Sequence, residues 1–156
     1  MDGWLSETGF FAHNVDQVGA KLNIPGYTDK INGGDKWWNF DLPSNWQQYI
    51  DKPLEEVCLN QWAEAHFAIF RSEVKTLMIK FEDFILNPQS VTDQITNYLG
   101  IGKLISKELP MVMVTFTPSN YRWKKRESMI TDLSKLDKVQ KLMNLLDYNM
   151  DPKTWI

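Results

Sequence analysis

Residues 77–88 read Leu77-Met78-Ile79-Lys80-Phe81-Glu82-Asp83-Phe84-Ile85-Leu86-Asn87-Pro88. The apolar run at the start of this segment lies inside Val74–Lys80 and is typical of a strand buried on both faces of a parallel sheet. Asn87 is a good helix cap and Pro88 suits the first position of a helix. We expect that helix to end at Gly100, because a helix C-terminus favours a residue that adopts left-handed backbone angles. The segment therefore predicts a strand, a turn and a helix in that order.

Two further amphipathic helices are expected on either side of this unit. The first begins at Pro53 and runs to about Ser72, with acidic residues in its first turn. Its apolar stripe is predicted to comprise Leu54, Val57, Cys58, Gln61, Trp62, Ala65 and Ile69. The second is expected as one helix from about Leu133 to Tyr148. Between them, residues 111–116 are compatible with a short strand or a buried loop.

Residues 1–45 are predicted to be rich in loops. A short helix is expected after Ser6, because Val15, Val18 and Leu22 have helical spacing. Proline and glycine then interrupt the chain at 25–26 and again at 32–35. The whole pattern predicts a single mostly helical α/β domain over residues 1–156, with one or two strands and long amphipathic helices.

Composition excludes several classes of function. The 156 residues are 43% apolar and 24% charged with a net charge of −3, so no overall positive field favours nucleic acid. No apolar run reaches the 18 residues of a membrane span, and no signal peptide is visible at the start of the sequence, so a soluble, cytoplasmic protein is expected. The single cysteine, Cys58, cannot form an internal disulfide, and His13 and His66 are too far apart for zinc-ligand spacing. No metal site is predicted.

An acidic pair, Glu82-Asp83, directly follows the predicted strand. The C-terminal ends of parallel strands line the ligand crevice, so this pair could reach a substrate there. The alternative is local: Asp83 caps the next turn and Glu82 pairs with a neighbouring base. A further open choice concerns Trp37 and Trp38, which could face a substrate but are more simply explained by core packing.

A compact basic cluster, Arg122-Trp123-Lys124-Lys125-Arg126, places four positive charges around one tryptophan in an otherwise acidic chain. Such a cluster can hold a phosphate or sulfate group, with the indole packed under a base or sugar. The alternative is a solvated helix start whose cations pair with Glu127 and Asp132. The residues alone do not separate these two interpretations.

Taken together, these segments resemble sulfotransferases. Residues 77–88 are similar to that family's hydrophobic strand with its Tyr-Glu-Asp-Leu and Asp-Pro motifs, and 95–101 to the Phe-Leu-Gly helix end that follows. Ser119 to Lys125 resembles the late Trp-Lys or Trp-Arg segment near the donor's 3′-phosphate, and Leu146-Asp147-Tyr148 the Leu-Gly-Tyr end of the last helix. The match runs from about Pro43 to Tyr148 in the family's order.

The resemblance implies a partial P-loop-like sulfotransferase fold, its C-terminal part. The family transfers a sulfuryl group from 3′-phosphoadenosine 5′-phosphosulfate to a hydroxyl or amine. It implies that Ser119, Arg122, Trp123, Lys124 and Lys125 line the 3′-phosphate and adenosine side of the donor, while Glu82 and Asp83 organise the strand end. The family's 5′-phosphosulfate loop, catalytic base and Arg-x-Gly-x-x-Gly segment have no counterpart here. We therefore expect the chain alone to be inactive.

A different class of function is a non-catalytic interaction module. One good strand cannot build a parallel sheet, and an orphaned strand edge pairs readily with another chain. Partners on this view are a second copy of the chain or a missing N-terminal half of the fold. Concentration-dependent mass would favour the module, and binding of the donor product would favour the sulfotransferase.

Overall fold

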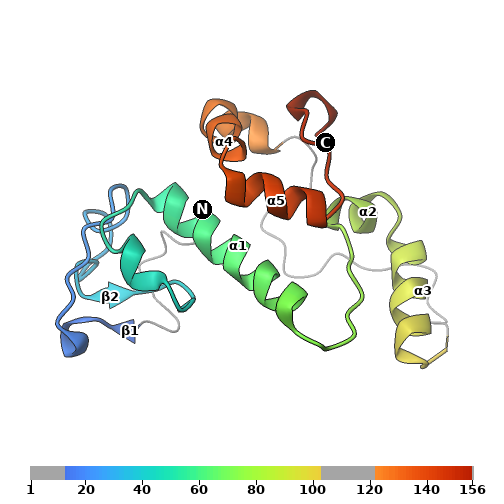
Figure 1. Ribbon diagram of the computed structural model, residues 1–156, viewed down its shortest axis with the longest axis horizontal. Coiled ribbons are helices and arrows are strands. Elements are labelled where there is room, and N and C mark those ends of the chain that lie inside the picture. Colours follow the sequence, from blue (N-terminus) through green and yellow to red (C-terminus); the bar gives the residue numbers. More distant parts are fainter. Residues whose placement is uncertain (1–12, 103–121, 156) are drawn as a thin grey trace. The chain divides into compact units, whose positions relative to one another are not determined.

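The computed structural model describes residues 13–102 and 122–155 (Figure 1). Within those ranges the chain is mostly helical, with five α-helices and one two-stranded sheet. The helices and strands are β1 His13–Asn14, η2 Asp16–Val18, β2 Trp37–Trp38, η3 Trp46–Tyr49, α1 Leu54–Arg71, α2 Phe81–Leu86, α3 Pro88–Leu99, η4 Arg122–Arg126, α4 Glu127–Ser134, α5 Asp137–Leu145 and η5 Pro152–Thr154. No helix among the described residues is long and apolar enough to cross a membrane.

The chain forms two compact units. Unit 1 is the described part of Met1–Ser72 together with Leu136–Leu142, and unit 2 is the described part of Glu73–Lys135 together with Met143–Ile156. The mostly helical α/β class is confirmed at this coarse level. The sheet, however, is antiparallel and lies in unit 1, so the described residues do not form the parallel sheet of a P-loop-like fold.

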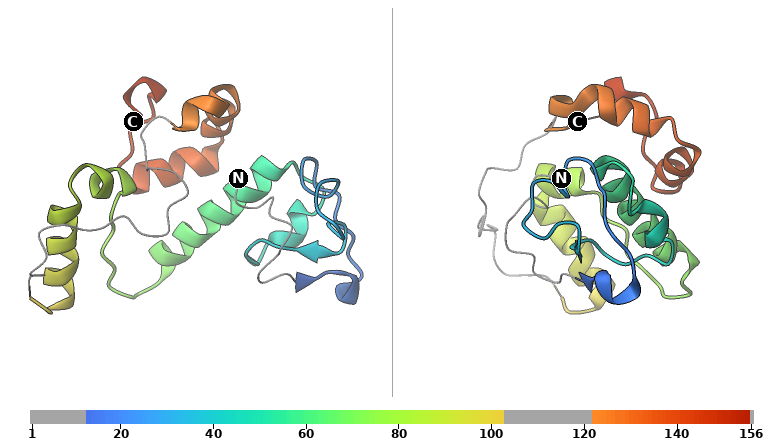
Figure 2. Two further views of the ribbon diagram at one scale, coloured as in Figure 1. Left: turned by 180° about the vertical axis from the view of Figure 1, so that it is seen from behind. Right: turned by 90° about the vertical axis from the view of Figure 1, so that its left-hand side faces the viewer.

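The sheet of unit 1 is a single short antiparallel pair. His13 pairs with Trp38 and Asn14 with Trp37, and the irregular segment 19–36 connects the two strands, as the blue-to-cyan ribbon in Figures 1 and 2 shows. Successive side chains of a strand point to opposite faces. Trp38 is accordingly buried, at 1% exposed, whereas Trp37 is 38% exposed.

The loop-rich segment carries most of the unit 1 core. Its buried apolar side chains are Val15, Leu22, Ile24, Tyr27, Ile31, Trp38 and Phe40, joined by Leu54 and Val57 of α1. Aromatic rings at its centre make tilted or edge-on contacts, with centroids 5.0 Å apart for Tyr27 and Phe40 and 5.1 Å for Trp38 and Phe40. Burial raises the pKa of Tyr27 to about 12. The segment without regular secondary structure thus surrounds a hydrophobic core.

The prediction of a short helix after Ser6 is wrong for residues 13–22. Only the single 3₁₀ turn η2 forms there, because Asn14 Oδ1 accepts the Asp16 backbone N–H at 3.0 Å and Gly19 ends the turn in the left-handed region. Such side-chain bonds compete with helix formation. Val18, one of the three residues that gave the helical spacing, is 69% exposed.

Helix α1 confirms the predicted helix from residue 54 to about 72, with Glu55 and Glu56 in its first turn. The predicted stripe is correct only in the first half: Leu54 and Val57 are buried, whereas Ala65 and Ile69 are exposed. Asn60 and Ala63 are buried instead. Gln61 exchanges two hydrogen bonds with Asp41, at 3.0 and 3.3 Å, so its role is polar.

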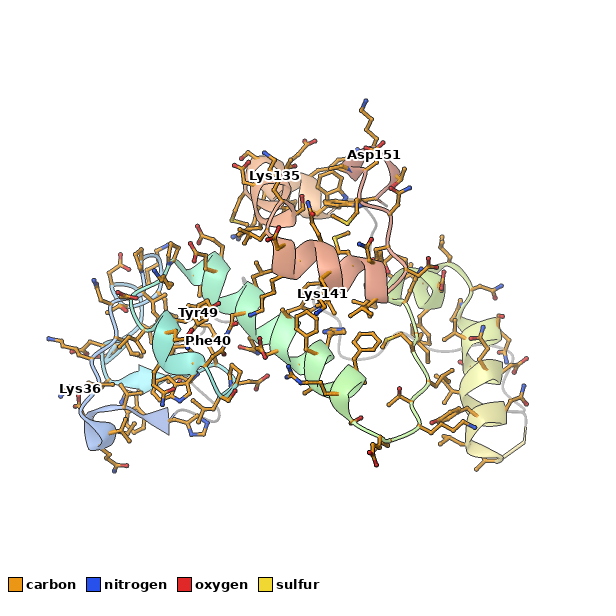
Figure 3. The ribbon with its side chains drawn as sticks, viewed as in Figure 1. Lys36, Phe40, Tyr49, Lys135, Lys141 and Asp151 are labelled. Carbon is orange, nitrogen blue, oxygen red and sulfur yellow. The ribbon has the colours of Figure 1, made fainter. Side chains whose placement is uncertain are left out.

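A polar network joins α1 to the start of α5 within unit 1. Asn60, 3% exposed, exchanges amide hydrogen bonds of 3.0 and 3.1 Å with Asn45. Lys138 Nζ donates to Asn60 Oδ1, lies 2.9 Å from Glu64 Oε1 and stands 5.9 Å from the centroid of the Tyr49 ring. Lys141 lies at a similar distance over the Phe67 ring (Figure 3). Buried polar groups are therefore satisfied here, which fixes residues 137–142 on α1.

Because of this network, part of the free energy of unfolding depends on pH in the acid range. The hydrogen bond from Lys138 holds the pKa of Glu64 below its usual value of about 4.5. Because the folded pKa lies below the unfolded one, the carboxylate stabilises the fold above about pH 4.5 and loses this effect as the pH falls through the folded pKa. We expect Glu64→Gln to flatten the acid-side fall in the free energy of unfolding, measured by urea denaturation from neutral to acid pH.

The control for this experiment is Glu73→Gln, because Glu73 is exposed and has no hydrogen bond or ion pair with any described residue. The control should keep the wild-type acid slope. Equal slopes for Glu64→Gln and the wild type would contradict the assignment of this pH dependence to Glu64.

In unit 2 the strand predicted at Val74–Lys80 is not paired. Residues 73–80 are irregular and mostly exposed, and they form no ladder with any other described segment. Tyr98 of α3 donates a hydrogen bond of 2.5 Å to the Lys75 carbonyl, which holds the segment beside α3. The apolar run alone predicted a strand, but a strand needs a partner, and none lies within the described residues.

Helix α3 confirms the prediction from its caps. Asn87 Oδ1 accepts the Ser90 backbone N–H, Pro88 begins the helix, and Gly100 ends it with φ 68°. The Ile101 N–H bonds the Thr96 carbonyl at 3.1 Å, as in a Schellman motif. Val91 of this helix is buried, whereas Tyr98 and Leu99 are exposed.

The single helix predicted from Leu133 to Tyr148 is two helices, α4 and α5, with a break at residues 135–136. Ser134 Oγ donates to the Thr131 carbonyl at 2.7 Å, and Asp137 starts α5 in the position where the helix dipole favours an acid. After α5, the Tyr148 N–H bonds the Met143 carbonyl at 2.9 Å and Asp147 takes φ 56°. The last helix thus closes with aspartate at the position that favours glycine.

Candidate functional site

The basic cluster forms the one-turn helix η4 in unit 2. Of the predicted donor-binding residues, Ser119 lies outside the described residues and Arg122 is described only as the first backbone position of η4. Lys124 and Lys125 are exposed, and Trp123 is half-buried. The structure thus places three predicted side chains together on one short element.

The indole of Trp123 is fixed by a second tryptophan. Trp155 contacts it edge-on, with ring centroids 5.4 Å apart and an interplanar angle of 72°. Trp155 is itself held by a hydrogen bond of 2.6 Å from its Nε1 to the Asn149 carbonyl. The buried Nε1 of Trp123 has no acceptor among the described residues. Trp123 therefore joins η4 to the C-terminal segment, and its packing under a base of the donor stays a prediction.

The electrostatics of η4 favour an anion. Four of its five residues are basic in a chain with a net charge of −3. Helix α4 begins directly after it, and its dipole adds a partial positive charge at this point, which Glu127 in the first turn partly offsets. Lysine and arginine bind phosphate and sulfate oxygens through short charge-assisted hydrogen bonds. The arrangement can hold a phosphate-like group at the surface.

The acidic pair after residue 80 meets the end of the last helix. Tyr148 donates a hydrogen bond of 2.8 Å to Glu82 Oε2, and burial followed by this bond raises the pKa of Tyr148 above its usual range. Lys80 donates to the Asp147 carbonyl at 2.6 Å and lies 5.0 Å from the centroid of the Tyr148 ring. Two segments that are 66 residues apart are thereby joined in unit 2. Glu82 thus has a partner, but it is the hydroxyl of a tyrosine distant in sequence and not the neighbouring base that the local interpretation predicted.

Cys58 and His66, two other side chains considered in the sequence, both lie on α1. Cys58 is half-buried on α1. His66 Nδ1 lies 2.8 Å from the Trp62 carbonyl and its ring packs against Trp62, as expected of a histidine at the core boundary. Within residues 13–102 and 122–155, no three His, Cys, Asp or Glu side chains gather as a metal site would require.

Sequence reasoning missed an open hollow in unit 1. It has a volume of about 500 Å³ and is lined by His13, Asn14, Val15, Gln17, Val18, Trp37, Leu42 and Trp46. Of these, only Trp37 had been considered as a residue that faces a substrate, and its neighbour Trp38 is a core residue. The signal that could have found the hollow is the adjacent tryptophan pair in a short strand, because alternation must expose one of the two.

Searches among known protein families, curated proteins and solved structures find no match to this chain.

Proposed function

We propose that the chain belongs to a sulfotransferase and binds the 3′-phosphate side of 3′-phosphoadenosine 5′-phosphosulfate through η4. The observation that carries the proposal is the set of cations on η4, held in place by the contact of Trp123 with Trp155. Lys124 and Lys125 would bind phosphate oxygens, and Arg122 and Ser119 would contribute from the same segment, as the resemblance implies.

A second observation supports the resemblance. The acidic segment after residue 80 and the end of the last helix are two of the motifs that resemble sulfotransferases, and both take part in one set of contacts, Tyr148 with Glu82 and Lys80 with Asp147. The proposal takes this contact within unit 2 as support for the ordered match.

In this proposal the chain alone binds the nucleotide donor and does not catalyse sulfuryl transfer. Sulfuryl transfer needs cations at the transferred group and a base for the acceptor, much as in phosphoryl transfer. The sequence contains no glycine-rich phosphate loop of the kinds that cradle such groups. The chain would supply positive charge at the far end of the nucleotide and position it.

Calorimetric titration of adenosine 3′,5′-bisphosphate, the donor product, tests the proposal. We expect saturable binding by the wild-type chain and at least about tenfold weaker binding by Lys124→Ala/Lys125→Ala, since each lost charge-assisted hydrogen bond is worth about 1.5–3 kcal/mol. Lys135→Ala is the control, because it removes one positive charge, half of what the double variant removes, from an exposed position where the lysine pairs with Asp132 at 2.8 Å (Figure 3). It should bind like the wild type.

Equal weakening by Lys135→Ala would show a general charge effect and contradict a site on η4. The absence of heat in all three proteins would contradict the proposal and favour the second candidate function, self-association. That candidate is supported by large apolar side chains of unit 2 that are more than half exposed, namely Val74, Phe81, Leu86, Leu99 and Ile101. It requires a mass that rises with concentration in the same samples.

A further inference from the structure

We infer that the hollow in unit 1 is a binding site for a neutral sugar ring, with the indole of Trp37 as its platform. The inference goes beyond the proposed function and rests on different residues. It holds whether or not η4 binds a nucleotide.

Trp37 is partly exposed and yet held in a fixed position. Its backbone is fixed by the pairing with Asn14 and by a hydrogen bond of 3.1 Å that its carbonyl accepts from Tyr27 Oη. Its ring lies directly beside Gly33: a Cβ atom at residue 33 would come within 3.2 Å of the Trp37 ring. Trp37 is 38% exposed, so part of this fixed residue stays open to solvent and can be covered by a ligand.

Polar groups also line the hollow. Asn14 Oδ1 is occupied by the Asp16 N–H, but the Asn14 amide NH₂ and the side chains of His13 and Gln17 have no hydrogen-bond partner among the described residues. Amide and imidazole groups both donate and accept hydrogen bonds, as the hydroxyls of a sugar do. The hollow therefore offers an apolar platform with unused polar groups beside it.

The charge of the lining bears on which ligands suit the hollow. The residues that line the hollow include no Asp, Glu, Lys or Arg. Asp16 and Lys36, which are adjacent in sequence to lining residues, pair with each other at 3.4 Å. A nucleotide, an amine or a fatty acid would leave its charge without a partner here. The mixed apolar and hydrogen-bonding lining also distinguishes the site from a pocket for a purely apolar ligand, which is enclosed and mostly hydrophobic.

The core of unit 1 supports the lining of the hollow from below. Trp46, the second indole of the lining, packs on the buried Trp38 with ring centroids 5.1 Å apart and an interplanar angle of 54°. Trp38 in turn donates a hydrogen bond of 2.9 Å from its Nε1 to the Asp41 carbonyl. The platform is thus built on the core of unit 1 and keeps its shape without a ligand.

The test is a titration of three probes, methyl β-D-glucoside, methyl β-D-galactoside and N-acetylglucosamine, followed by the tryptophan indole N–H signals in proton–nitrogen NMR spectra. We expect at least one probe to shift the Trp37 and Trp46 signals saturably with a Kd of about a millimolar, as a single small ring allows. Trp37→Ala should abolish the saturation, and Gln17→Ala should weaken it several-fold. Trp155→Ala, a change in unit 2, should leave it intact.

Because Gln17 is exposed and outside the core, its variant keeps the test valid if Trp37→Ala does not fold. Unshifted Trp37 and Trp46 signals with all three sugars would overturn the inference, as would an unchanged response in both Trp37→Ala and Gln17→Ala. Saturable shifts by adenine or phenol, added as uncharged non-sugar rings, without any sugar response would also overturn it. None of these readouts depends on adenosine bisphosphate, so the two proposals fail independently.

Discussion

Replacing Trp38 with alanine is expected to lower the free energy of unfolding by about 3–5 kcal/mol. Trp38 is 1% exposed and among the largest fully buried side chains of the described residues. Its ring contacts both Phe40 and Trp46 at centroid distances of 5.1 Å, so truncation removes apolar burial and leaves a cavity between them. It also leaves the Asp41 carbonyl without its hydrogen bond from Nε1.

Guanidinium denaturation followed by far-ultraviolet circular dichroism measures this loss. The neighbouring tryptophan supplies the control: Trp37→Ala changes the same residue type one position away, where the side chain is 38% exposed, and should cost about 1 kcal/mol. A marginally stable domain tolerates a loss of the second size and can unfold after a loss of the first. Equal costs would contradict the in–out alternation of β2.

Local signals in the sequence were enough to predict α1 and α3. Both begin at or just after a proline, and α3 carries an asparagine cap and a terminal Gly100, so the reasons for their ends lie within a few residues of those ends. The same reasoning failed at residues 74–80, because an apolar run does not identify a strand without the segment that pairs with it. Strand pairing is a property of two segments, and the sequence displays them one at a time.

The core of unit 1 could not be located from periodicity. It is built mainly from a segment without regular structure, where Leu22, Ile24 and Tyr27 are almost fully buried at irregular spacing. Turn residues and side-chain hydrogen bonds determine that burial, as when Thr28 Oγ1 accepts the Ile24 N–H at 2.8 Å. Neither helical nor strand spacing applies to such a chain.

The candidate site was predictable in part. Charge density alone identified residues 122–126, because four cations in five positions are visible in any sequence. The contact of Trp123 with Trp155 was not predictable, since no pattern links positions 32 residues apart, and it shows that Trp123 packs against the C-terminal segment. The hollow at Trp37 was missed for a related reason: its lining comes from both strands, η2 and η3.

The second large effect is expected at Gly34, in the irregular segment that surrounds the core. A Cβ atom at this position would lie 2.8 Å from the Thr28 carbonyl oxygen, 2.9 Å from the Ile31 carbonyl oxygen and 3.1 Å from the Thr28 Cα atom. All three are backbone atoms, so no side-chain rotation relieves the clash. The Gly34 N–H also donates to the Ile31 carbonyl at 2.8 Å, and any shift of the backbone weakens that bond.

We therefore expect Gly34→Ala to lower the free energy of unfolding by about 2–3 kcal/mol, the upper part of the range for overpacked sites. Gly19→Ala is the matched control, because a Cβ atom there meets nothing within 4 Å and only the φ of +71° opposes it, at a cost of about 1 kcal/mol. Denaturant unfolding of the two variants separates steric crowding from backbone conformation. If Gly19→Ala proved the more costly, the close approach of residues 28, 31 and 34, which positions Tyr27 and Ile31 in the core, would be contradicted.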